Sequence, residues 1–468
     1  MRKALLFLLL YGSCSLLNAQ YAGTWYGILE AGGQQIPLDL ELTETADGYT
    51  GGLLSPLQSP QRVPFSSLRV AGDSLWAEVD FLSMNFVGSF QRDQLTGTFR
   101  QGTFSTALTF QAEATPAYQQ LLDTEEKPAR PQDPTEFPYL REAVTFPSGA
   151  EAVTMAGELT LPKDAPPKAA VILITGSGPQ NRNQDLGPSI NHRPFLVISD
   201  WLTRQGYAVL RYDDRGTGES TGDFSTATSE DFAVDAAGAL RFLRQRFGGS
   251  AIPIGLAGHS EGGMIAPMVV AAGEAVDFLI LLAAPGLSID TLMVEQRKLI
   301  NQSTPADEPV LSAVSTFVKA HRDMADEAFR SGLRDTIISV IPSLPDTLQV
   351  SIIDPAAFAD TYVSGLASPW IRYFLAYEPT ANLSEVKVPV LALSGERDTQ
   401  VSPRNLDAIE TTLKATGNPD VTAVLVPGAN HLLQPAESGL PEEYGQIETT
   451  VDENVLTLIS EWLEQRFN

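Results

Sequence analysis

Residues Gly258 to Gly262 read Gly-His-Ser-Glu-Gly, a G-x-S-x-G pattern that can surround a nucleophilic serine. The pattern alone is weak evidence, because it recurs at Gly218–Gly222 with Ser220 at its centre. Ser260 follows the apolar run IPIGLA and precedes the small, apolar run GGMIAPMVVAA, as expected of a sharp strand-to-helix turn. Polar residues flank Ser220, which predicts a loop. We therefore predict that Ser260 is the nucleophile.

A serine hydroxyl is inert at its free pKa and needs a positioned base. The chain has four histidines. His431 lies in VPGANHLLQP, directly after the last predicted strand, at the sheet edge where open α/β sheets place their sites. His259 is the neighbour of Ser260 and points elsewhere, His192 precedes a predicted helix, and His321 lies within one. We predict His431 as the base and a packing role for His259.

The third member of such a triad is a carboxylate that holds the histidine tautomer and stabilises the imidazolium. The segment VPVLALSGERDTQV supplies two acids on the loop after a predicted strand. We predict Asp398, with Glu396 as the alternative. The chain order Ser260, Asp398, His431 is that of α/β-hydrolases.

An oxyanion hole needs two backbone N–H donors beside the nucleophile. The first expected donor is Glu261, the residue after Ser260. The second is Ser177, in the loop GSGPQNRNQD that follows the apolar strand AVILIT. A glycine-rich loop can instead cradle phosphate, but this one lacks the lysine and the spacing of a P-loop.

These residues require a scaffold that presents several loops at one edge. From residue 139 to 468, continuous apolar runs alternate with helical periods, which predicts a doubly wound, mostly parallel sheet. Residues 287–380 break this alternation with helical stretches and aromatic residues. We predict that they form a helical cap inserted over the site.

The N-terminal part has a different pattern. Residues 20–113 contain runs that alternate apolar and polar residues, such as Ile36–Leu42, which predicts a small antiparallel barrel or sandwich. A structural module and a ligand- or glycan-binding module are both consistent with it. Residues 114–138 contain five prolines in a polar run and are predicted to be an extended linker.

The N-terminal sequence and the net charge limit the expected location and binding partners of the protein. Residues 1–19 combine Arg2 and Lys3 with a short apolar run, as in a secretory signal, so we expect a secreted or periplasmic protein without a transmembrane segment. Cys14, the single cysteine, lies in that signal; a lipoprotein anchor through it is the less favoured alternative. The formal charge of −26 disfavours nucleic acid. The composition does not determine the oligomeric state.

Five motifs, in order, resemble those of bacterial α/β-hydrolase carboxylesterases with a small N-terminal β domain. They are GSGPQNRN, RYDDRGTGES, GHSEGG, GERDTQV and NHLLQP. The resemblance covers residues 20–468 and implies hydrolysis of short-chain carboxylic esters without a cofactor or metal, by Ser260, Asp398 and His431. It also implies that Asp214 and Arg215 brace loops beside the site.

One departure from the family concerns the oxyanion loop. Relatives usually carry Asp-Arg-Asp-Glu after GSGPQ, where this chain has Asn181, Arg182, Asn183 and Gln184. Any role of those acids is therefore in question. Our functional hypothesis is a serine carboxylesterase acting on a small-molecule ester. The alternatives are a serine peptidase of the same fold, of aminopeptidase or dipeptidyl-peptidase type, and a non-catalytic binding protein on this scaffold.

Overall fold

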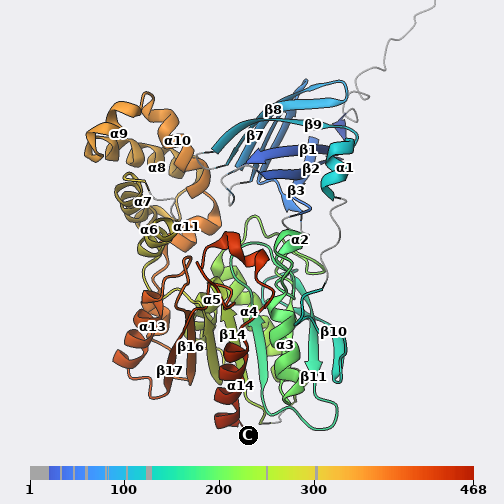
Figure 1. Ribbon diagram of the computed structural model, residues 1–468. Coiled ribbons are helices and arrows are strands. Elements are labelled where there is room, and N and C mark those ends of the chain that lie inside the picture. The colour runs from blue at the N-terminus through green and yellow to red at the C-terminus, as the bar shows by residue number, and fades with distance from the viewer. Residues whose placement is uncertain are drawn as a thin grey trace, which may run out of the picture.

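The computed structural model describes most of the chain after residue 20 (Figure 1). The described residues are 21–31, 34–45, 48–57, 62–79, 82, 84–101, 104–122, 129–248, 251–300 and 304–467. The predicted signal, with Cys14, lies outside them. No described helix is both long enough and apolar enough to span a bilayer.

The N-terminal domain is one curved antiparallel sheet in the order β4-β3-β2-β1-β9-β8-β7-β6-β5. Alternating side chains point inward and form its core, among them Trp25, Leu40, Leu75 and Phe110. Many of the outward positions are polar, which matches the predicted period of two, although Val87 and Phe104 are exposed apolar exceptions. The strands are β1 (Gly23–Ala31), β2 (Gln34–Thr45), β3 (Gly48–Leu54), β4 (Val63–Pro64), β5 (Ser67–Ala71), β6 (Ser74–Val79), β7 (Met84–Gln91), β8 (Gln94–Gln101) and β9 (Phe104–Gln111).

The segment predicted as an extended linker is partly helical. Helix α1 (Pro116–Leu122) packs on the N-terminal sheet through Tyr118, which is 2% exposed and whose hydroxyl donates to Asp39. Further along, Arg130 donates to the carbonyl oxygens of Ile190 and Gly445 in the catalytic domain. One buried aromatic and one arginine thus anchor a segment that has no apolar period, and the linker prediction is wrong for these residues.

The catalytic domain contains an eight-stranded sheet in the order β10-β11-β13-β12-β14-β15-β16-β17. Pairing is antiparallel from β10 through β11 to β13 and parallel from β13 to β17. Strands β12 and β13 lie in the sheet in the reverse of their order in the chain. As a result, β14 lies near the middle of the sheet, and its carboxyl end lies near the centre of the sheet edge. The strands are β10 (Leu140–Pro147), β11 (Thr154–Leu161), β12 (Ala170–Ile174), β13 (Ala208–Tyr212), β14 (Ile254–His259), β15 (Phe278–Leu282), β16 (Val390–Gly395) and β17 (Val421–Val426).

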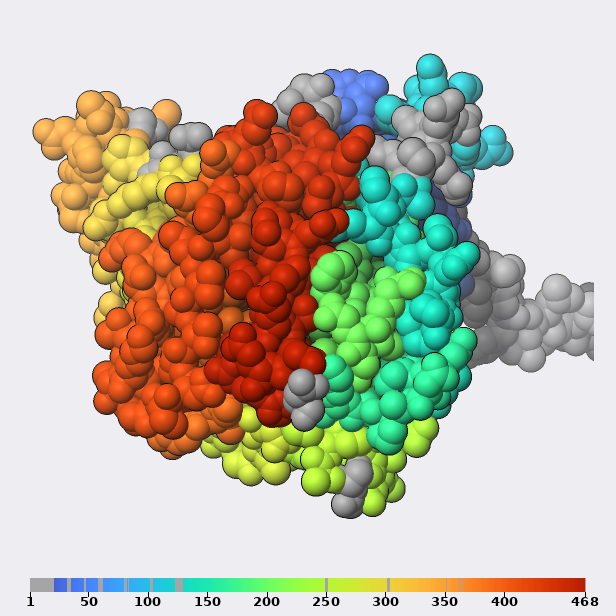
Figure 2. All heavy atoms as spheres, turned by 60° about the horizontal axis from the view of Figure 1, so that its bottom comes forward, coloured from blue at the N-terminus to red at the C-terminus, as the bar shows by residue number. Residues whose placement is uncertain are grey.

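Helices cover both faces of this sheet. One face packs against α3 (Pro194–Arg204) and α14 (Glu453–Phe467), which lie side by side in Figure 2. The other face packs against α4 (Ser229–Arg246), α5 (Glu261–Ala271) and α13 (Arg404–Ala415). Strands such as β12 and β15 are buried along their whole length, which explains their continuous apolar runs.

The insertion between β15 and β16 is helical and lies above the carboxyl edge of the sheet, beside the N-terminal domain (Figure 1). Its apolar faces join the core of the α4/α5 side of the sheet through residues such as Val310, Phe329 and Leu375. Its helices are α6 (Ile289–Leu299), α7 (Asp307–His321), α8 (Asp326–Val340), α9 (Asp346–Ser351), α10 (Pro355–Leu366), α11 (Pro369–Ala376) and α12 (Pro379–Leu383).

Candidate active site

Ser260 sits on a sharp turn between β14 and α5. Its backbone angles, φ 55° and ψ −120°, lie in a region that residues other than glycine rarely occupy. The Ser260 N–H donates to the Leu282 carbonyl oxygen at 2.8 Å, which ties the turn to the neighbouring strand. Such local strain is typical of functional sites, and this turn presents the hydroxyl to a cavity.

The glycines around Ser260 are required by close packing. A Cβ on Gly258 would lie 2.0 Å from the Gly262 carbonyl oxygen, and one on Gly262 would lie 2.2 Å from the Ile174 carbonyl oxygen. The turn can therefore approach β12 only without side chains at these positions. This close packing explains why the G-x-S-x-G pattern of this chain has glycine at both positions.

We expect Gly262→Ala to lower the free energy of unfolding by about 3 kcal/mol or more, because the backbone must shift to admit a methyl group. Gly273→Ala, beyond the other end of α5, is the control. A Cβ there meets nothing within 4 Å, although its φ of 85° still costs about 1 kcal/mol. Chemical denaturation of both variants measures the difference, and equal losses would contradict this account.

His431 and Asp398 meet on loops that follow β17 and β16. His431 Nδ1 lies 2.9 Å from Asp398 Oδ2, and both side chains are buried. The other oxygen, Oδ1, accepts the backbone N–H groups of Gln400 and Val401 at 2.9 and 2.8 Å. The alternative acid, Glu396, instead accepts the N–H of Gly428.

The two residues predicted to form an oxyanion hole, Glu261 and Ser177, both lie near Ser260. Glu261 is the first residue of α5, so its helix has no acceptor for its N–H. Ser177 lies on the loop after β12 and lines the same cavity as Ser260. A Cβ on the adjacent Gly176 would lie 3.1 Å from Ser260 Cβ, so this loop packs directly against Ser260.

Asp214 connects the oxyanion loop to the sheet. Its carboxylate accepts from Thr175 Oγ1 at 2.7 Å and from the Gln180 N–H at 2.9 Å. Burial raises the pKa of Asp214 to about 8. Arg215 points to α4, where it pairs with Asp235.

The sequence predicts only a packing role for His259, but in the structure its ring also has two hydrogen-bond partners. Its Nε2 lies 2.9 Å from the His431 carbonyl oxygen, and Gln184 Nε2 lies 2.8 Å from its Nδ1. Gln184 donates and the carbonyl accepts, which fixes a neutral ring protonated on Nε2. Burial lowers the pKa of His259 to about 3. His259 therefore holds the loop that carries His431.

We expect Gln184→Glu, which restores the acid usual in relatives, to raise the pKa of His259 by about 1–3 units, because a carboxylate would then face Nδ1. An NMR titration of the His259 ring protons measures the shift. Gln180→Glu on the same loop is the control for a remote charge, because Gln180 donates to the Ser177 carbonyl oxygen rather than to His259. An unmoved pKa in Gln184→Glu would contradict the assigned contact.

The other substitutions in the oxyanion loop have structural partners. Asn183 Oδ1 accepts from the buried Arg211, and Asn181 Oδ1 accepts the N–H of Asn183 at 3.0 Å. Arg182 pairs with Asp213 at 2.5 Å. The amides thus keep hydrogen bonds that shape the loop without the acids of relatives.

The remaining candidates from the sequence lie outside the catalytic cluster. Ser220 Oγ donates to the Asp213 carbonyl oxygen at 2.7 Å and accepts the Ala156 N–H at 2.9 Å. The ring of His192 is buried and contacts Thr450, and His321 ends α7 on the surface.

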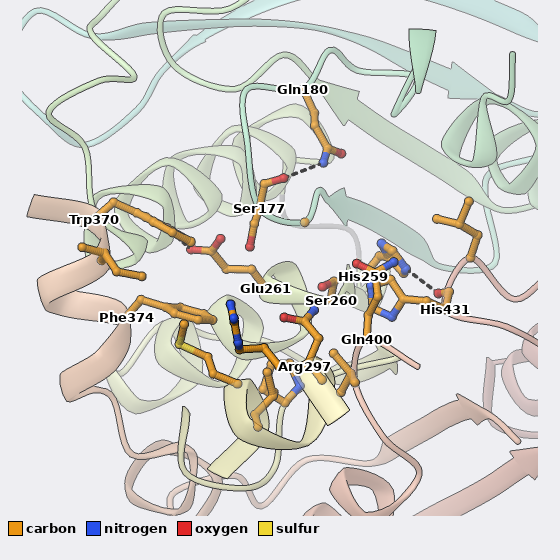
Figure 3. A pocket seen from close by; sticks show the side chains of 18 of the residues that line it. Ser177, Gln180, His259, Ser260, Glu261, Arg297, Trp370, Phe374, Gln400 and His431 are labelled. Atoms are coloured by element: carbon orange, nitrogen blue, oxygen red, sulfur yellow. Dashed lines mark hydrogen bonds between the residues drawn. The ribbon is translucent and has the colours of Figure 1, made fainter. Parts of the chain in front are cut away.

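A cavity of about 630 Å³ opens above Ser260 between the sheet edge and the cap. Ser260, His431 and the oxyanion loop line its floor (Figure 3). The cap contributes mainly apolar walls, including Leu311, Tyr362, Leu366, Trp370, Ile371 and Phe374. A concave, largely apolar site with a few convergent polar groups is typical of small-molecule binding. Within the described residues, no group of three or more potential ligands could hold a metal ion.

The sheet order, the Ser260 turn and the two loops are those of the α/β-hydrolase fold. Residues 194–327 match the family described as serine aminopeptidase, S33. The chain is 24% identical to esterase EstD of Thermotoga maritima over 310 residues, which is 66% of this chain and 65% of that protein. The family match and this relative confirm the resemblance to α/β-hydrolase esterases. The chain thus spans slightly less than two thirds of the length of this relative.

Solved structures of hydrolases are also similar. The Pyrococcus furiosus esterase Pf2001 has 15% identity and a TM-score of 0.44, covering 70% of this chain and 92% of that one. The proline iminopeptidase of Mycobacterium smegmatis has 17% identity and a TM-score of 0.42, covering 69% and 98%.

Proposed function

We propose that the protein is a serine hydrolase that cleaves small carboxylic esters through an acyl-enzyme. The observation that carries the proposal is the strained Ser260 turn, which opens into the same cavity as His431, whose Nδ1 is 2.9 Å from Asp398. A relative named as an esterase supports the ester class. Without Asp398, neither the tautomer nor the orientation of His431 would be fixed.

In the proposed reaction, Ser260 Oγ attacks the ester carbonyl carbon and its proton passes to His431 Nε2. Asp398 accepts a hydrogen bond from Nδ1–H and stays ionised, so that Nε2 is the free base and the imidazolium is stabilised. The N–H groups of Glu261 and Ser177 stabilise the oxyanion. The intermediate collapses, and the leaving alkoxide takes the proton from Nε2. Water, deprotonated by His431, then attacks the acyl-enzyme and releases the acid and Ser260.

Short acyl chains are the favoured substrates within this proposal. The cavity of about 630 Å³ is of the size that holds small molecules, and the cap closes it with aromatic walls. The test is hydrolysis of p-nitrophenyl acetate, butyrate and octanoate by residues 20–468. Turnover that falls from butyrate to octanoate would support the short-chain proposal. No turnover of any ester would overturn the esterase proposal.

Peptide hydrolysis is the second candidate, because a buried carboxylate, Glu261, lines the cavity and could receive a substrate amine. The family match, named for serine aminopeptidases, points the same way. Alanine p-nitroanilide separates the candidates. A kcat/KM for this amide comparable with that for p-nitrophenyl butyrate would favour the peptidase.

A further inference from the structure

The side chain of Glu261 plays no part in the reaction described above. Only its backbone N–H belongs to the oxyanion hole. The side chain runs from the Ser260 turn toward Trp370 of the cap, with the Ser177 hydroxyl turned toward the same carboxylate (Figure 3). The residue lines the cavity but is only 2% exposed, so its carboxylate is almost covered by the largely apolar wall.

The hydrogen bonds of this carboxylate are unequal. Glu261 Oε1 accepts from Ser229 Oγ at 2.6 Å and from Trp370 Nε1 at 2.9 Å. Oε2 is buried and makes no hydrogen bond of normal geometry within the described residues, although the Ser177 hydroxyl lies close enough to the carboxylate to lower its pKa. A buried carboxylate oxygen without a donor costs free energy, so a ligand that supplies one would bind there favourably.

The charges around the cavity favour a cationic donor. Both partners of Oε1 are neutral, and the cavity-lining Arg297 is already paired with Asp307 at 2.9 Å. Among the described residues that line the cavity, Glu261 is thus the acid that is not paired with a cation. Burial raises the pKa of Glu261, and an adjacent cation would favour the charged form.

We infer that Glu261 is a specificity residue, and that the preferred substrates carry a protonated amino group beside the ester. This inference rests on the proposed esterase function and names its substrate class. The amine N–H donates to Glu261 Oε2, which binding of the amine must first uncover, because this oxygen is buried near Trp370 and Ser177. The amine can belong to the acyl group or to the alcohol, and the two sources require different test esters.

Two pairs of esters, each with a neutral isostere, test the inference by pH-stat at pH 7. L-alanine ethyl ester is compared with ethyl isobutyrate for the acyl side. 2-(Dimethylamino)ethyl butyrate is compared with 3-methylbutyl butyrate for the alcohol side. We expect the amine to exceed its isostere in kcat/KM by about tenfold or more in one pair, the strength of a hydrogen bond to a charged group. The pair that responds identifies the source.

The variant Glu261→Gln should reduce this amine-to-isostere ratio about tenfold or more, whatever happens to absolute rates. Glu396→Gln is the matched control, because it makes the same chemical change at an acid that accepts the Gly428 N–H and does not line the cavity. Its ratio should stay within about twofold of the wild type. Ratios near one in both wild-type pairs, or an equal fall in the control, would overturn the inference.

A binding measurement separates this inference from the esterase proposal. Calorimetry with Ser260→Ala compares isobutylamine, protonated at pH 7, with isobutanol as its neutral counterpart. Binding of the ammonium at least tenfold tighter supports the inference even if no ester is hydrolysed. Equal affinities overturn it even if neutral esters are good substrates. This measurement also holds if Glu261→Gln does not fold.

Discussion

Replacing Ser260 with alanine is expected to lower kcat on p-nitrophenyl butyrate by about 10⁶-fold, the scale of loss when a triad serine is removed. The hydroxyl is the proposed attacking group, and no neighbouring side chain can replace it. Serine and alanine both carry a Cβ, so the strain at φ 55° is the same in both proteins. The melting temperature should therefore stay within a few degrees of the wild type.

Ser220→Ala is the matched control, because Ser220 occupies the second copy of the same pattern. Its hydroxyl hydrogen-bonds to the Asp213 carbonyl oxygen and the Ala156 N–H, away from the cavity. We expect a loss of about 1–3 kcal/mol in stability and less than twofold in kcat. A fluorophosphonate probe should label the wild type and Ser220→Ala but not Ser260→Ala. Label on Ser220, or a Ser260→Ala enzyme with a tenth of wild-type activity, would refute the assignment.

The parts of this site that the sequence predicts are those set by local pattern. Ser260 could be predicted because the strand before it and the helix after it are both buried, and buried elements appear in the sequence as continuous apolar runs. His431 and Asp398 were found because loops after parallel strands meet at one edge, and the structure places their side chains 2.9 Å apart. The α/β-hydrolase fold followed from the same alternation and is confirmed.

Contacts between distant segments could not be predicted in this way. Trp370 reaches Glu261 from the cap, 109 residues away, and His259 reaches the His431 carbonyl across 172 residues. Nothing in local spacing encodes such pairs. Gln184 did carry a signal, because it replaces a usual acid, but its partner depends on how the loop folds over β14.

Strand β10 and helix α1 were also not predicted, for a related reason. Strand β10 lies at the sheet edge and exposes much of its length, so it lacks the apolar run of an inner strand. In α1, the buried Tyr118 is one aromatic in a polar, proline-flanked segment. Single anchoring residues carry no period, and only the tertiary contact with Asp39 reveals their role.

Replacing Asp398 with asparagine is expected to lower kcat about 10⁴-fold while the fold stays intact. The structure gives the reason in the surroundings of Oδ1, which accepts the N–H groups of Gln400 and Val401. These two donors would fix the oxygen of the asparagine amide at the same place. Its NH₂ group must then face His431 Nδ1.

A donor facing Nδ1 makes that nitrogen an acceptor and moves the ring proton to Nε2. His431 could then no longer take the proton of Ser260, although every heavy atom kept its position. Glu396→Gln is the control two residues earlier, because Glu396 accepts only the Gly428 N–H among its described hydrogen bonds, and a glutamine oxygen can do the same. We expect its kcat within about twofold of the wild type, measured on p-nitrophenyl butyrate with melting temperatures for both variants. A larger loss in Glu396→Gln than in Asp398→Asn would transfer the role of the acid to Glu396.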